Sequence, residues 1–130
     1  MVKELAYELE TKKPFAAVVE SVITRVPEHK FRVLAVHDVQ QTLAEKGLER
    51  DPLKIIEVCN AGFAHQALSQ DPMAALFMPC RFTIQVEGGK TIVRLARPTM
   101  IADMLPEAGL DELASDVEKT LKRIMHESVQ

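Results

Sequence analysis

The sequence predicts an α+β fold, a two-layer sandwich with a mainly antiparallel sheet of about five strands, two long helices on one face and short connecting helices. Three observations lead to this prediction. Several short segments alternate apolar and polar residues, which is typical of strands with one buried face. Segments 14–26 and 110–125 repeat apolar residues at helical spacing along one side. Gly88-Gly89 separates two alternating segments and indicates a tight hairpin.

The N-terminal part of the chain predicts a strand followed by a long helix. Over residues 4–10, apolar and mostly acidic residues alternate, as in a half-buried strand. Pro14 suits the first position of a helix, and Pro27 is expected to end it. The apolar stripe of this helix consists of Phe15, Val18, Val19, Val22, Ile23 and Val26.

The middle of the chain predicts two strands, each followed by a short helix. Residues 31–37 form the first strand, and Asp38 caps a helix that Gly47 ends. Residues 53–58 form an interior strand, because apolar side chains occupy both of its faces. Asn60 then caps a helix that Asp71-Pro72 closes. Four residues of this helix are expected to point inward: Phe63, Ala64, Ala67 and Leu68.

Residues 80–97 predict the hairpin in residue-by-residue register. With Gly88-Gly89 as the turn, each inner apolar residue of the first strand meets an apolar residue or Thr of the second. The expected pairs are Glu87 with Lys90, Val86 with Thr91, Ile84 with Val93, Phe82 with Leu95 and Cys80 with Arg97. A short apolar turn near Met100 and the long helix 110–125 complete the fold.

Composition limits the classes of function. At 130 residues the chain is expected to form one domain, residues 1–130, and its 47% hydrophobic content is ordinary for a globular protein. A net charge of −3 without a basic patch argues against nucleic-acid or membrane binding. The first five residues lack the apolar core of a signal peptide, and two cysteines are too few for a disulfide scaffold. We therefore expect a cytoplasmic protein with reduced thiols.

The two cysteines are the main candidates for a functional site. Cys59 ends a predicted strand just before the Asn60 cap, and Cys80 starts the hairpin beside Arg97. A helix start and a guanidinium both favour a thiolate. If the two strands are antiparallel neighbours, the thiols converge at one sheet edge. They then form a soft-metal site, a redox pair or a nucleophile, or they pack as small core residues.

His37 adds a candidate ligand to the two thiols. Its neighbour Asp38 does not form a dyad with it, because adjacent strand residues point to opposite faces. The candidate metal ligands are therefore Cys59, Cys80 and His37, and the wider candidate site adds Arg97 and Asn60. The residues identify no cofactor and leave open whether the protein is an enzyme.

Several short motifs follow one another along the chain: His37-Asp38-Val39, Leu43, Gly47, Cys59-Asn60, Ala67-Leu68, Pro79-Cys80-Arg81 and Arg97-Pro98. In their order and spacing they resemble the domain of unknown function 302 family. One departure is Ala61, where many members have proline. The resemblance implies a TATA-binding-protein-like α+β fold, commonly assembled as a homodimer, without an established activity and without implying DNA binding. It also places Cys59, Cys80 and His37 at motif positions.

The leading hypothesis is a small cytoplasmic homodimeric domain that binds a small ligand or a soft metal near the two cysteines. The first alternative is a thiol-dependent enzyme or redox protein that uses Cys59 and Cys80. The second is a purely structural or interaction domain.

Overall fold

A computed structural model describes residues 5–130, and Glu4, the predicted start of the first strand, lies outside them. Five antiparallel strands form one sheet in the order β1-β5-β4-β3-β2, as the predicted fold class requires. The strands are β1 (Ala6–Thr11), β2 (Arg32–Asp38), β3 (Leu53–Cys59), β4 (Cys80–Glu87) and β5 (Lys90–Ala96). The α-helices are α1 (Phe15–Glu28), α2 (Val39–Ala44), α3 (Ala61–Gln70), α4 (Met100–Met104) and α5 (Asp111–Ser128), and η2 (Pro72–Phe77) is a 3-10 helix.

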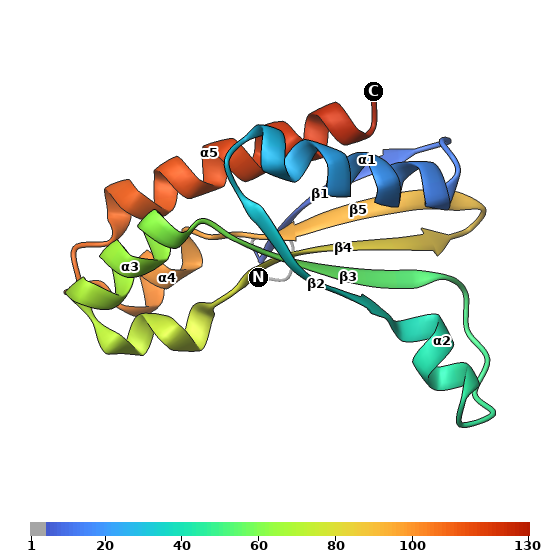
Figure 1. The fold of residues 1–130 in the computed structure, drawn as a ribbon, viewed down its shortest axis with the longest axis horizontal. Helices are drawn as coiled ribbons and strands as arrows, with labels where there is room; N and C mark the ends of the chain where they lie inside the picture. The colour runs from blue at the N-terminus through green and yellow to red at the C-terminus, as the bar shows by residue number, and fades with distance from the viewer. Residues whose placement is uncertain (1–4) are drawn as a thin grey trace.

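The long helices α1 and α5 lie side by side over one face of the sheet (Figure 1). The short helices α3 and α4 lie at one end of the sheet, and α2 extends from the other end (Figure 1). Among residues 5–130, no helix has both the length and the apolar character that a membrane crossing needs. Because both long helices lie over the same face, the other face of the sheet has no helical cover within residues 5–130 (Figure 1).

The hairpin has the predicted register. Phe82 pairs with Leu95, and Ile84 pairs with Val93. Gly88 and Gly89 both have positive φ, 59° and 78°, as this tight turn requires. The side chains of Glu87 and Lys90, however, form ion pairs with other residues.

Glu87 and Lys90 do pair as backbone neighbours, but their side chains turn to other partners. Lys90 Nζ lies 2.9 Å from Glu10 of β1, and Arg94 Nη1 lies 2.6 Å from Glu87. Arg94 also binds Glu8 at 2.7 Å. Long side chains on the uncovered face thus connect β1, β5 and the end of β4.

The apolar stripe of α1 faces the sheet, and the helix is slightly longer than predicted. Val18, Val22 and Val26 are completely buried, whereas Ile23 at the edge of the stripe is 37% exposed. Pro27 lies inside the last turn, and the helix continues to Glu28. Proline removes one backbone donor there, but the N–H groups of His29 and Lys30 donate to the carbonyls of Val26 and Pro27 and close the turn.

The main hydrophobic core fills the space between the sheet and the two long helices. It combines β-branched and large side chains from the inner sheet face with the buried side of α5. The residues of this core that are fully inaccessible to solvent include Ile56, Val58, Phe82, Ile84, Val93, Leu95, Leu121 and Ile124. The predicted amphipathic patterns of the strands and of α5 therefore account for this core.

A second, smaller cluster lies beneath α3, η2 and the start of α5. Its buried members are Ala67, Ala74, Leu110 and Leu113. The 3-10 helix η2 was not predicted, although Asp71 caps it by accepting a 2.8 Å hydrogen bond from the Met73 N–H. The sequence signal was Asp71-Pro72, which suits a helix start as well as a helix end. Leu68, predicted to point inward, is 41% exposed.

The predicted caps of the other two short helices are present. The Asp38 carboxylate accepts a 2.9 Å hydrogen bond from the Gln41 N–H at the start of α2. The Asn60 side chain accepts one of 3.0 Å from the Phe63 N–H at the start of α3. A polar residue just after a strand therefore sets the point at which each helix begins.

Candidate functional site

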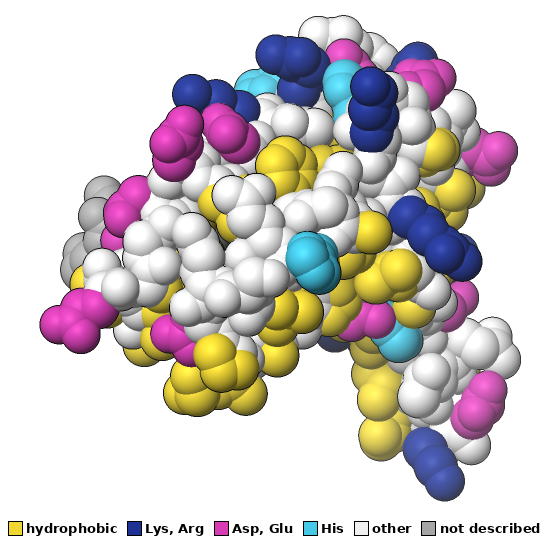
Figure 2. Space-filling view, turned by 60° about the vertical axis from the view of Figure 1, so that its left-hand side comes forward, with side chains coloured by type: hydrophobic (Ala, Val, Ile, Leu, Met, Phe, Trp, Pro, Cys, Tyr) yellow, Lys and Arg dark blue, Asp and Glu magenta, His cyan; other side chains and the backbone are white. Residues whose placement is uncertain are grey.

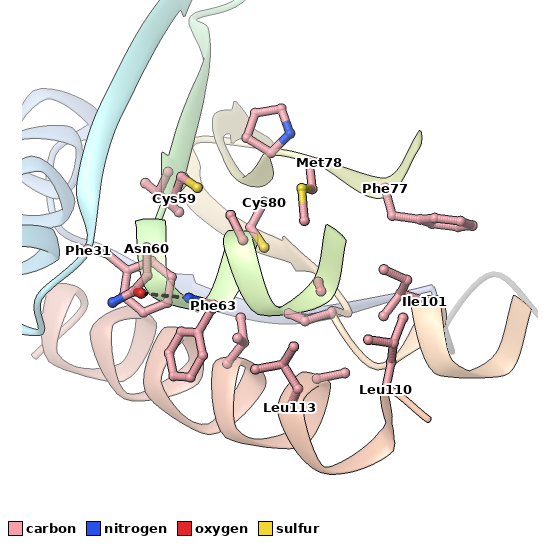
Figure 3. A pocket seen from close by; sticks show the side chains of 17 residues that line it. Phe31, Cys59, Asn60, Phe63, Phe77, Met78, Cys80, Ile101, Leu110 and Leu113 are labelled. Carbon is pink, nitrogen blue, oxygen red and sulfur yellow. Dashed lines mark hydrogen bonds between the residues drawn. The ribbon is translucent and has the colours of Figure 1, made fainter. Parts of the chain in front are cut away.

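An apolar cavity of about 80 Å³ lies where β3 ends and β4 begins. Its walls come from α3, η2, the β4 start, α4 and α5, and the lining side chains point toward one another across it (Figure 3). Apart from Cys59, Asn60 and Cys80, the described side chains that line it are all hydrocarbon or thioether groups. Prominent among them are Phe31, Phe63, Phe77, Met78, Ile101, Leu110 and Leu113.

The cavity arises because several residues at this end are small. Ala64 and Ala67 of α3 and Ala114 of α5 are among the residues that line it. In the main core, the buried residues of α1 are valines. Protein interiors are normally close-packed, so a space of this size beside a buried cluster is a distinct feature.

The polar groups of Asn60 are already engaged by the backbone. Its Oδ1 accepts the Phe63 N–H at 3.0 Å, and its Nδ2 donates to the Lys30 carbonyl at 2.9 Å. Asn60 thus joins the start of α3 to the turn before β2. The amide holds the cavity wall in place, and both of its polar groups are occupied.

Cys59 and Cys80 both line the cavity, but they are not a close pair. The direct cross-strand partner of Cys80 is Val58. Adjacent residues of a strand point to opposite faces, so the Cys59 side chain points to the face opposite to that of Val58 and Cys80. Both thiols are free. The expectation that they converge as a cysteine pair is wrong, because a one-residue offset in register separates their side chains.

The expectation that both thiols are polarised toward thiolate is also wrong. Burial raises the pKa of the Cys80 thiol to about 11; the Cys59 thiol adds to this shift, and the charge of Arg81 opposes it. Burial likewise raises the pKa of Cys59. Desolvation disfavours the charged thiolate and outweighs the helix start beside Cys59.

Arg97 lies away from Cys80. The pairing of β4 with β5 begins at Phe82 and Leu95, so the chain has left β4 before it reaches Arg97. The Arg97 guanidinium donates to the Thr99 hydroxyl at 3.1 Å, and its carbon lies 6.0 Å from the Tyr7 ring centre. Arg97 therefore belongs to a polar group between β1 and α5, outside the cavity lining.

His37 lies at the opposite end of the β2–β3 pair from Cys59. It pairs with Ile55, whereas Cys59 pairs with Arg32. Its ring Nε2 is 2.9 Å from the Glu57 carboxylate on the exposed sheet face. Within residues 5–130 no three His, Cys, Asp or Glu side chains are grouped to hold a metal ion. The proposed trio of Cys59, Cys80 and His37 is therefore not assembled.

Sequence reasoning missed a second polar group, centred on Glu118 of α5. Its carboxylate accepts hydrogen bonds from the Tyr7 hydroxyl at 2.6 Å, the Thr99 hydroxyl at 2.6 Å and the Thr99 N–H at 3.1 Å. Burial opposes ionisation of Glu118, but these bonds and the charge of Arg97 outweigh it and lower the pKa. Lys122 Nζ lies 4.1 Å from the Tyr7 ring centre. No local motif indicated this group, because its members come from three distant segments.

The apolar cavity lining was also missed, for a different reason. Phe63, Leu110 and Leu113 carry the same helical spacing as core residues. Spacing predicts which side of a helix is buried but not whether the neighbouring side chains fill the space. The three small residues Ala64, Ala67 and Ala114 were the feature of the sequence that could have indicated the cavity.

Comparison with known proteins gives matches over nearly the whole chain. The model of the family described as "Domain of unknown function DUF302" matches residues 7–128. The chain is also similar to the crystal structure of an uncharacterized conserved protein DUF302 from Bacillus stearothermophilus. The two are 29% identical with a TM-score of 0.89, over 95% of this chain and 98% of that one. No curated protein matches the sequence significantly.

Proposed function

The chain belongs to the DUF302 family, and on that premise we propose that it is a cytoplasmic binding domain for a small apolar molecule, or for the apolar end of a larger one. The observation that carries the proposal is the cavity lined by Cys59, Asn60 and Cys80 together with hydrocarbon side chains. The two free thiols support a reducing compartment.

The chemistry of the cavity favours a ligand without polar groups at its buried end. The Asn60 amide is occupied by backbone partners, and the thiols are neutral and poor hydrogen-bonding groups. Binding would therefore depend on burial of apolar surface and on dispersion contacts. An apolar cavity of about 150 Å³ binds benzene. This cavity is smaller, about 80 Å³, and suits a compact group.

The structure gives less support to the two other chemistries. A nucleophile or redox thiol works as a thiolate, and burial raises the pKa of both cysteines. A soft metal needs several converging ligands, and no such group occurs in the part of the chain that the structure describes. Neutral thiols instead act as small polarisable wall groups.

A titration with dissolved xenon or cyclopropane, compact apolar probes that suit a cavity of about 80 Å³, followed by NMR of the amide and methyl signals, tests this proposal. We expect saturable shifts for Phe63, Met78 and Leu113, which surround the cavity. Ala67→Met fills the space and should abolish the shifts, whereas Ala16→Met, at an exposed position of α1, should leave them unchanged. Shifts that do not saturate, or that persist in Ala67→Met, would contradict the proposal.

We also propose that the homodimer implied by the family forms through β2. This strand is at one edge of the sheet, so it presents unpaired backbone groups to a partner. Leu34 is 50% exposed and Val36 is 40% exposed on the same strand. Light scattering should give a dimer for the native chain and a monomer for Leu34→Lys. A monomeric native chain, or a variant that remains dimeric, would contradict this assignment.

A further inference from the structure

The end of the molecule that contains the cavity also has an unusual outer surface. Among the described residues, ten large hydrophobic side chains are exposed, and five of them lie on α3, η2 and α4. These five, which we call the apolar cap, are Leu68, Met73, Leu76, Phe77 and Met104. Leu76 is 73% exposed and Met104 is 62% exposed. Such a concentration is typical of an interaction surface rather than of scattered apolar residues.

The elements that carry the apolar cap surround the same cavity. Helices α3 and η2 pack against each other, which brings Leu68 close to the η2 residues. Phe77 of η2 and Ile101 of α4 line the same cavity, so Met104 lies on the helix that flanks η2 across it. Figure 2 turns this end of the molecule toward the viewer and shows hydrophobic side chains at its surface.

The same end is strongly acidic. Residues 60–80 and 98–116 contain no Lys or Arg but six carboxylates, Asp71, Asp103, Glu107, Asp111, Glu112 and Asp116. All sixteen Lys and Arg of the chain lie elsewhere, against the remaining thirteen Asp and Glu. These two segments therefore carry a formal charge of −6, and the basic residues beside them include Lys30, whose carbonyl contacts Asn60, and Arg32, which pairs with Cys59.

Exposure makes this charge available to a partner. Asp103, Glu107, Asp111 and Glu112 are exposed on α4, on the loop after it and on the first turn of α5. Arg97 is adjacent to this end in the sequence, but it faces Tyr7 and Thr99. The apolar cap is thus bordered by carboxylates, and complementary charge on a partner would give it both orientation and a faster encounter.

We propose that the apolar cap binds a basic amphipathic helical segment of another protein. An amphipathic helix lays its apolar side on such a surface and places Lys and Arg opposite the bordering carboxylates. A second copy of this chain is a poor occupant, because a two-fold contact would bring the exposed carboxylates of the two copies together. An anionic membrane is repelled for the same reason. This inference is independent of a ligand in the cavity.

Fluorescence anisotropy with two synthetic peptides tests the inference. The probe is a labelled helix of about four turns with Leu on one side and Lys on the other, and the control replaces Lys with Glu. We expect saturable binding of the Lys peptide and none of the Glu peptide. Raising NaCl from about 50 mM to about 300 mM should weaken binding several-fold, because exposed charges are screened.

Matched variants assign the binding to the apolar cap. Leu76→Ser with Met104→Ser should weaken binding by about tenfold. Leu48→Ser, at a 57% exposed position outside the cap, should change it by less than about twofold. Glu107→Gln with Glu112→Gln should reduce both the affinity and its salt dependence. Glu45→Gln with Glu49→Gln, exposed near α2, should reduce neither.

Several results would overturn the inference. They are equal binding of the two peptides, no saturable binding of the Lys peptide, or an equal loss in Leu48→Ser. Co-sedimentation with phosphatidylcholine or phosphatidylglycerol vesicles that depends on Leu76 would assign the surface to lipid instead. A change of oligomeric state in Leu76→Ser would assign it to a second copy of the chain.

Discussion

The two ends of the helical layer differ in how their side chains fill the space beneath them. Under α1 and the C-terminal half of α5, branched and large residues such as Ile56, Phe82 and Leu121 are fully buried. Under α3 and η2, two of the four buried residues are alanines, and a cavity remains. The charges differ as well, since the acidic carboxylates border the cavity end. The long helices thus cover the packed core, and the short helices and the start of α5 form the walls of the cavity.

The largest expected effect is the removal of a core side chain. Phe82→Ala should lower the free energy of unfolding by about 3–5 kcal/mol, because it leaves a new void in a packed core. Leu113→Ala should cost less, about 2 kcal/mol, because Leu113 already borders the cavity. Denaturation by urea measures both losses. Equal losses, or a larger one for Leu113→Ala, would contradict the difference in packing between the two ends.

Enlarging a side chain should give a smaller difference in stability between the two ends of the molecule. Val22→Phe overpacks the main core and should cost about 1–3 kcal/mol. Ala67→Met extends into the cavity, and its flexible thioether should change stability by less than about 1 kcal/mol. The same denaturation experiment measures both. A loss of similar size in the two variants would mean that the cavity does not accept added atoms.

The pH dependence of stability should show the contribution of the polar group centred on Glu118. Glu118 has a lowered pKa in the folded protein, so its stabilising effect is present above the pKa of the unfolded state. That effect is lost as the pH falls through the folded-state pKa. Glu118→Gln should therefore be less stable near neutral pH and show a flatter decline of stability below about pH 4. An unchanged acid profile would show that the carboxylate contributes nothing.

The smallest effect that we expect is a difference in reactivity between the Cys59 and Cys80 thiols. Both thiols have raised pKa values, and Cys80 has the larger shift to about 11. In single-thiol variants, Cys59→Ser and Cys80→Ser, a disulfide reagent should modify Cys59 faster than Cys80. Both should react more slowly than a cysteine in an unfolded peptide. Faster reaction than the peptide at either position would restore the nucleophile hypothesis.

Local patterns in the sequence were sufficient to predict most of the fold. Alternation and the Gly88-Gly89 turn gave the hairpin register, and Asp38 and Asn60 marked two helix starts. These features depend on neighbours within a few residues. The 3-10 helix η2 escaped because Asp71-Pro72 served at once as the end of α3 and the start of the next turn.

The candidate site was only partly predictable, because it depends on contacts between distant segments. Cys59, Asn60 and Cys80 do line the cavity, but neither His37 nor Arg97 does. The offset between Cys59 and Cys80 follows from the pairing of β3 with β4, which the sequence of either strand leaves undetermined. Burial, which decides the pKa of both thiols, likewise depends on the packing of α3 and α5 around them.

Diffraction from a xenon-pressurised crystal tests the central claim most directly, because xenon enters apolar cavities without needing a polar contact. The account predicts a xenon atom between Ala67, Cys80 and Leu113, and none among Ile56, Phe82 and Leu121 in the main core. In Ala67→Met this atom should be absent. A site that takes up no xenon, or one in which Ala67→Met retains it, would contradict the cavity as a place for an apolar ligand.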